Sequence, residues 1–280
     1  MDAAPLKVLA VAVGNTRTRV ARFSGRPMSG ESQALPSTDA PGLVRAIQAL
    51  AKGEELVVIS SVNEPAAAAL ERELRPAFPE RVYRFGRDLE IPIANALTDD
   101  STVGQDRLLC AIGASVRAEQ ACVVVDAGTA ITVDFVDGEG TFQGGVIAPG
   151  VQMMLDALHA RTAALPQIKF ALPDAALGPF GKDSPHAMRL GVLNAARGLV
   201  RHTIEQYAQV FGGYPQIVAT GGDALALFEH DDLVEHIVPD LQLIGIAEAC
   251  ARVLEGDGAP RPKPARRPSP LDDDDSWSES

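Results

Sequence analysis

The stretch VAVGNTRTRV at residues 11–20 is repeated in outline by VDAGTAITVD at residues 125–134. Each copy reads as an apolar strand, a turn of small residues with a glycine and a hydroxyl side chain, and a second strand. Such a hairpin presents backbone N–H and threonine hydroxyl groups at its turn, and these donors suit a phosphate. The repeat therefore predicts two related halves that face one cleft.

Aligned without a gap, the two copies differ at one position of chemical interest. Asp126 in the second copy stands where the first has Ala12. A carboxylate at the end of an apolar strand is costly to bury unless it is paired, hydrogen-bonded or bound to a cation. Asp126 is thus a candidate for a cation or phosphate site, with a buried capping aspartate as the alternative. An ordinary hairpin turn is the alternative for the glycines at 14 and 128.

Composition narrows the class of protein. The chain has 280 residues, of which 46% are hydrophobic, and a net charge of −12 without a basic stripe, so a nucleic-acid partner is not expected. No apolar run has the length of a membrane span and the start does not resemble a signal peptide, so we expect a cytoplasmic protein without a membrane contact. Cys110, Cys122 and Cys250 lie in apolar surroundings, which favours buried thiols.

Strands and helices alternate along the chain, which indicates an α/β fold. In the first half we expect a hairpin at 6–13 and 18–23, a buried parallel strand at 55–62, a helix capped by Asn63 and a helix at 105–119. The second half repeats this order, with strands at 121–125, 130–136, 141–148 and 216–219 and helices at 151–162, 185–210 and 244–254.

Gly104-Gln105-Asp106-Arg107 lies where an irregular loop becomes a helix. A helix N-terminus favours anions. An adjacent aspartate and arginine there can share one task, in which the arginine neutralises transferred charge while the aspartate accepts a hydroxyl proton. The alternative is that Asp106 only complements the positive end of the helix dipole. Small residues at 144–150 and 220–223 allow a ligand or a backbone to come close, and either Asp183 or Ser184 can cap the following helix.

Taken in order, these segments resemble type III pantothenate kinase, a member of the actin-like and sugar-kinase ATPase superfamily. The resemblance covers about residues 6–254. It is carried by GNTRT at 14–18, ISSV at 59–62, VGQDRL at 103–108, VVDAGTAITVDF at 124–135, GGVIAPG at 144–150, ARTAALP at 160–166, GKDS at 181–184 and TGGDA at 220–224.

The resemblance implies an α/β fold of two ribonuclease-H-like (actin-like ATPase) domains with ATP between them. The predicted domains are residues 1–118 and 119–254. Residues 255–280 are rich in proline, arginine and aspartate, and we expect a disordered tail there, with a partner-binding peptide as the alternative.

The resemblance also implies an activity, the ATP-dependent phosphorylation of pantothenate to 4'-phosphopantothenate, which is the first step of coenzyme A biosynthesis. It implies a homodimer, Mg²⁺ with ATP, and a monovalent cation, K⁺ or NH₄⁺, bound by Asp126. Asp106 would be the general base, and the ATP phosphates would lie against Ala12, Val13, Gly14, Asn15, Thr16, Arg17, Thr18, Arg19 and Thr129. Pantothenate would be bound by Gly104, Gln105, Asp106, Arg107 and Ser184.

Three positions depart from the family pattern. Ala12 stands where the first hairpin normally carries an aspartate that helps hold Mg²⁺, and a methyl group cannot ligate a hard cation. Leu97 stands about where a substrate-contacting tyrosine is usual, and Ser184 replaces a threonine but keeps the hydroxyl. An active kinase is therefore one reading, and a catalytically weakened or non-catalytic relative that binds nucleotide and regulates another process is the second.

Overall fold

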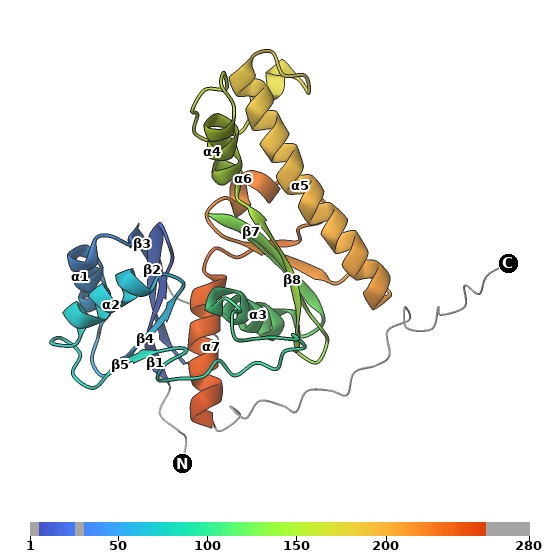
Figure 1. The fold of residues 1–280 in the computed structure, drawn as a ribbon. Coiled ribbons are helices and arrows are strands. Elements are labelled where there is room, and N and C mark those ends of the chain that lie inside the picture. Colours follow the sequence, from blue (N-terminus) through green and yellow to red (C-terminus); the bar gives the residue numbers. More distant parts are fainter. Residues whose placement is uncertain (1–5, 26–30, 256–280) are drawn as a thin grey trace.

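The computed structural model describes residues 6–25 and 31–255. Figure 1 shows five layers: α1 and α2, a first sheet, the helix pair α3 and α7, a second sheet, and then α4, α5 and α6. This arrangement confirms the predicted α/β class. Apart from Glu255, the predicted tail lies outside the described residues. No described helix combines the length and apolar character that a membrane crossing requires.

The first sheet has the strand order β3-β2-β1-β4-β5. Strand β1 pairs antiparallel with β2 and parallel with β4, which is the buried parallel strand expected from the apolar run. The elements of this half are β1 (Lys7–Val13), β2 (Arg17–Ser24), β3 (Ser32–Pro36), α1 (Ala40–Leu50), β4 (Leu56–Ser61), α2 (Glu64–Leu74), β5 (Val82–Arg84) and α3 (Gln105–Ala118).

The second sheet repeats that order as β8-β7-β6-β9-β10, with the same parallel and antiparallel pairs. The predicted internal repeat is therefore confirmed as a repeat of topology. Its elements are β6 (Cys122–Ala127), β7 (Ala130–Val136), β8 (Phe142–Pro149), α4 (Val151–Arg161), the 3-10 turn Ala175–Leu177, α5 (Ser184–Phe211), β9 (Gln216–Thr220), α6 (Ala224–Phe228), β10 (His236–Ile237) and α7 (Leu241–Glu255).

The ungapped alignment of the two hairpins is wrong beyond the turn. Ala12 pairs with Arg19, whereas Asp126 pairs with Thr132, so the second turn is one residue shorter. With that shift the burial patterns of β2 and β7 coincide from their second residue to their seventh. Strand burial has a period of two, so the shift decides which side chains face the core.

Local signals located most elements within a few residues. Asn63 caps α2 through Ala66 N (3.2 Å), and α3 begins at Gln105. The sequence analysis did not identify β3, α1, β5 or β10. Two of these strands have only three and two residues, too short for a periodic pattern. Helix α1 carried a recognisable signal, because the Asp39 side chain caps it and a proline follows in its first turn.

Helices α3 and α7 cross between the sheets with their backbones in close approach. A Cβ atom added at Gly245 would lie 1.8 Å from the Leu109 carbonyl oxygen, and one at Gly113 would lie 2.6 Å from that of Leu241. The core around this crossing takes buried residues from β1, β6, α3 and α7 together. It includes all three free cysteines, Cys110, Cys122 and Cys250. Because α3 packs on β4, β6 and β7, the domain boundary at 118/119 stays a prediction.

The crossing makes a stability prediction for Gly245→Ala. The new methyl group meets backbone that cannot move aside, so we expect a loss of more than about 3 kcal/mol in the free energy of unfolding, measured by urea denaturation. Gly191→Ala is the matched control, because Gly191 lies exposed in α5 with no atom near the new Cβ. There the free energy of unfolding should rise by about 0.5–1 kcal/mol. Equal effects at the two positions would contradict the close approach of the helices.

Candidate active site

Asp106 lies in the first turn of α3, where its carboxylate folds back over the helix start. Its Oδ1 accepts a hydrogen bond from Arg107 N (2.9 Å), and a Cβ atom at Gly104 would lie 2.3 Å from that oxygen. Glycine is therefore needed before the helix for this arrangement. Burial raises the pKa of Asp106, while the Arg107 N–H and guanidinium oppose the rise. A carboxylate with a raised pKa is a stronger base than a free aspartate.

Arg107 is held from the second sheet by Asp134. Its Nε donates to Asp134 Oδ1 (3.0 Å) and Oδ2 (3.1 Å), Nη2 also donates to Oδ1, and the guanidinium lies 5.4 Å from the centre of the Phe142 ring. Burial raises the pKa of Asp134 and Arg107 lowers it. Gly145 opposite Asp134 must lack a side chain, since a Cβ atom there would lie 2.3 Å from Oδ1.

Sequence reasoning missed Asp134, although a signal was present. Asp134 interrupts an apolar strand at a core-facing position and is 1% exposed. The same argument from an aspartate in an apolar strand had singled out Asp126. Fixing Arg107 from both sides leaves its orientation little freedom, which suits a group that must meet a charged substrate at a defined place.

Asp126 is the penultimate residue of β6 and lies between Thr132 on β7 and Thr220 on β9. Burial raises the pKa of Asp126 to about 7; the charges of Asp106 and Asp134 add to the rise, and Arg19 opposes it. A Cβ atom at Gly221, whose φ is +96°, would lie 2.4 Å from Asp126 Oδ1. The carboxylates of Asp106, Asp126 and Asp134 thus lie within electrostatic reach of one another. The described residues contain no cluster of three or more His, Cys, Asp or Glu that could hold a metal.

The first turn is braced by Ser37, a residue that sequence reasoning missed. Gly14 N donates to Arg17 O (3.1 Å), and Ser37 Oγ donates to Gly14 O (2.8 Å) and lies 3.0 Å from Thr18 Oγ1. Thr18 is fully buried, and the exposed fractions of Ala12 and Val13 are only a few per cent. Of the predicted phosphate residues, those with exposed or half-exposed side chains are Asn15, Thr16, Arg17, Arg19 and Thr129.

The segment before α7 connects the first hairpin to the second sheet. Arg19, opposite Ala12 in the first hairpin, donates from Nη1 to Pro239 O (2.5 Å). Thr220, opposite Asp126, donates to the same carbonyl (3.4 Å). The second turn also contacts the start of α4, because Gly150 N donates to Thr129 O (3.1 Å). The Pro239 carbonyl therefore links the first hairpin to β9, the strand beside the second hairpin; that both turns face one cleft stays a prediction.

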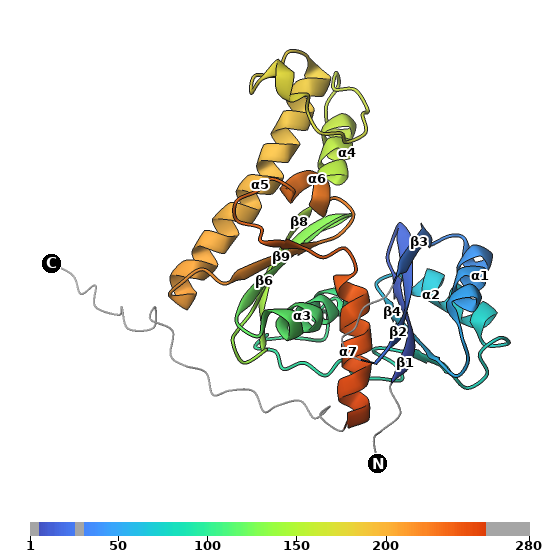
Figure 2. The same cartoon turned by 180° about the vertical axis from the view of Figure 1, so that it is seen from behind.

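Two predicted residues have other surroundings than expected. The side-chain amide of Gln105 ties α3 to the first sheet, since Nε2 donates to Phe85 O (3.1 Å) and Oε1 accepts from Ser60 Oγ (3.3 Å). Ser184 is exposed at the start of α5, and both views place that start at the outer end of the α4–α5 arm, away from α3 (Figures 1 and 2). Within one chain the structure does not bring Ser184 to Asp106.

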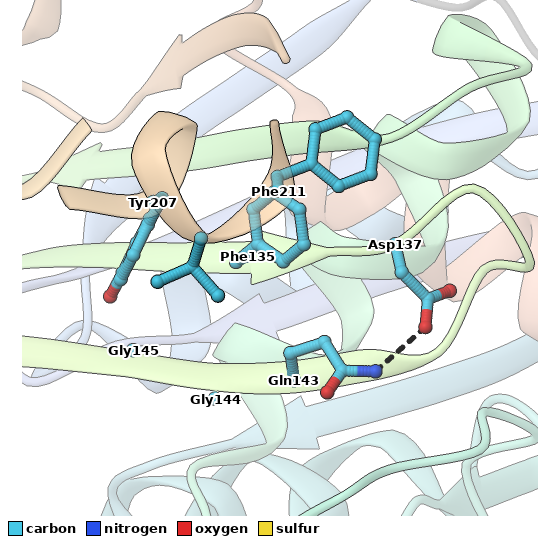
Figure 3. A pocket seen from close by; sticks show the side chains of 8 residues that line it. Phe135, Asp137, Gln143, Gly144, Gly145, Tyr207 and Phe211 are labelled. Atoms are coloured by element: carbon cyan, nitrogen blue, oxygen red, sulfur yellow. Dashed lines mark hydrogen bonds between the residues drawn. The ribbon is translucent and has the colours of Figure 1, made fainter. Parts of the chain in front are cut away.

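A cavity of about 420 Å³ lies on the α5 side of β7 (Figure 3). Side chains alternate across a strand, so Phe135 faces this cavity while Asp134 faces α3. Gln143 Nε2 donates to Asp137 at its rim (2.7 Å), and Tyr207 donates to Val133 O (3.1 Å). The cavity and the Asp134 side chain therefore lie on opposite faces of β7. It is lined by Phe135, Asp137, Gln143, Gly144, Gly145, Tyr207, Val210 and Phe211.

Comparison with known proteins identifies the family. The type III pantothenate kinase profile matches residues 8–206. A type III pantothenate kinase of Rhodospirillum rubrum is 31% identical over 85% of this chain and 96% of its own, and one of Akkermansia muciniphila is 32% identical over 83% and 93%. A solved structure described as a conserved putative Baf family transcriptional activator from Campylobacter jejuni shares the fold, with a TM-score of 0.55 at 18% identity over 89% of this chain and all of that one.

The family assignment agrees with the geometry, because the matched residues include both hairpins, the start of α3 and the start of α5. The chain belongs to the type III pantothenate kinase family.

Proposed function

We propose that the protein transfers the γ-phosphate of ATP to the primary hydroxyl group of pantothenate, the first step towards coenzyme A. The observation that supports this most is that Asp106, from the start of α3, and Arg19, from the first hairpin, both act electrostatically on Asp126 in the second hairpin. Nothing in the described structure favours the regulatory alternative.

In the proposed reaction Asp106 accepts the proton of the attacking hydroxyl group. Arg107, held by Asp134, orients the acceptor and offsets negative charge beside the base. Backbone N–H groups of the two turns and the Thr129 hydroxyl donate to the phosphates. Each of these groups is placed before the substrates arrive, so little reorganisation is needed in the transition state.

The strand neighbours of Ala12 do not offer Mg²⁺ a direct protein ligand. Ala12 offers a methyl group, and its strand neighbours are Arg19, a cation, and Ser60, whose hydroxyl group bonds to Gln105. Mg²⁺ is commonly held by nucleotide phosphates and water, so we treat it as part of the MgATP substrate. Asp126 does fit a monovalent cation, K⁺ or NH₄⁺, which would balance the surplus negative charge of the three carboxylates.

Two observations support a homodimer. Large apolar side chains are exposed on β8 and α4 (Ile147 and Met153) and at or beyond the two ends of α5 (Phe180, Val210 and Tyr214). Ser184 lies away from Asp106 in its own chain, so it would reach the acceptor site of a second copy. The three free, buried cysteines support a reducing, cytoplasmic location.

The base assignment predicts that Asp106→Asn lowers kcat by about 10²–10⁴-fold, because the amide cannot accept the proton. Phosphopantothenate formation should be assayed with MgATP and K⁺, and nucleotide binding by calorimetry should be retained. Asp156→Asn, at an exposed position of α4, is the control and should remain fully active. Normal turnover by the Asp106 variant would refute the assignment.

The cation site predicts a pH-dependent effect of Asp126→Asn. The folded-state pKa of Asp126 is raised from 3.8 to about 7, so the folded protein binds the proton more tightly and loses stability as pH rises between these values. The variant escapes this loss. Its gain in unfolding free energy over the wild type, measured in K⁺-free buffer, should grow from pH 4 to 7 and then level off. Added K⁺ at pH 8 should stabilise the wild type and leave the variant unchanged. A stability gain of the variant that does not depend on pH would contradict the prediction.

The dimer predicts complementation between two impaired variants. Asp106→Asn and Ser184→Ala should each be weakly active alone, but mixed and re-equilibrated subunits should recover about a quarter of wild-type activity, because half the dimers regain one intact site. If Ser184 acted within its own chain, mixing would restore nothing. A protein that sediments as a monomer under assay conditions would also contradict the proposal.

A further inference from the structure

Arg19 connects the first hairpin to the segment that precedes α7. Its Nη1 donates to Pro239 O (2.5 Å), and its Nη2 lies 2.8 Å from Asp240 Oδ1. Both side chains are partly exposed, at 30% and 27%. The ion pair therefore joins β2 of the first sheet to a segment more than 200 residues away in the chain. Both side chains remain accessible to solvent.

Asp240 is the residue immediately before α7. Its carbonyl accepts the first helical hydrogen bond, from Ile244 N (3.0 Å). A carboxylate at this place is stabilised by the positive end of the helix dipole, so Asp240 is a firm support for a guanidinium group. The same helix touches α3 through the approach of Gly245 to Leu109, three residues beyond Asp106 on the chain.

The guanidinium of Arg19 lies within electrostatic reach of the second hairpin. Arg19 stands opposite Ala12, and its charge lowers the pKa of Asp126 across the gap between the sheets. The buried Nε–H of Arg19 has no hydrogen-bond acceptor among the described residues. A buried donor of this kind usually finds a partner, and a phosphate oxygen between the hairpins would supply one.

We propose that Asp240 is a positioning residue that holds the Arg19 guanidinium towards the phosphates of the bound nucleotide. This inference rests on the proposed function in one respect, that the nucleotide phosphates lie between the two turns. Asp240 does not touch the nucleotide; it fixes the direction of Arg19 together with the Pro239 carbonyl. Because α7 also contacts α3, the pair sets the place of the first hairpin relative to the helix that carries Asp106.

The test separates nucleotide binding from chemistry. Asp240→Ala should raise the KM for ATP about tenfold, and should weaken binding of a non-hydrolysable ATP analogue by the same factor in calorimetry. The kcat and the KM for pantothenate should change less than about threefold. Asp240→Asn, which keeps the size of the side chain but removes its charge, should give a comparable loss, because Asp240 Oδ1 contacts Arg19 as an ion pair without a hydrogen bond. A structural defect alone would not change the KM for ATP selectively.

A double-mutant cycle identifies the route of the effect. Arg19→Ala should weaken ATP binding at least as much as Asp240→Ala, and the double variant should be no worse than Arg19→Ala, because Asp240 acts only through Arg19. Arg22→Ala is the matched control: Arg22 lies three residues further along β2 and pairs with Glu55 (2.7 Å), so it should lower thermal stability without changing the KM for ATP.

Each outcome is decisive. An unchanged or tighter analogue affinity in Asp240→Ala, or effects of the two substitutions that multiply independently, would overturn the proposal. If the wild type binds the analogue but does not phosphorylate pantothenate, the proposed acceptor fails while the calorimetric comparison still decides the role of Asp240. If the wild type binds no analogue, both proposals fail.

Discussion

The close approach of the α3 and α7 backbones holds the two halves of the chain together. Gly113 and Gly245 remove the side chains that would keep these helices apart; α3 packs on strands of both sheets, and α7 packs on β1 and β2 of the first sheet. One core is therefore shared by both halves of the chain. The two sheets keep a fixed relation because a packed interior yields little to small displacements, and that relation sets the place of Asp106 between the two hairpins.

The two halves have the same topology but different chemistry at equivalent positions. Asp126 in the second half has a pKa near 7 among other carboxylates, whereas Ala12 in the first half is neighboured by Arg19. A carboxylate can hold a cation and a guanidinium group can hold an anion. The edge between the sheets thus offers complementary charges to a nucleotide and its cations, although the protein carries a net charge of −12.

Several functional relationships follow from chain segments that are distant in sequence. Ser37 braces the first turn, Asp134 holds Arg107, and Asp240 holds Arg19. Asp134 could have been found as a carboxylate in an apolar strand. Ser37 and Asp240 gave no such signal, because a serine in a loop and an aspartate before a helix are common, and only their partners give them a role.

The α/β class, the internal repeat, most helix and strand positions and the motifs of the family could be predicted from the amino-acid sequence, because these follow from local periodicity, caps and turns. The sequence could not determine the one-residue shift between the hairpins, the short strands β5 and β10, or the separation of Ser184 from Asp106. Those depend on strand register and on contacts between segments far apart in the chain. The same holds for the pKa of Asp126 and for the directions of the Arg107 and Arg19 side chains. These arise from burial and from charges on distant segments, which no local sequence pattern contains.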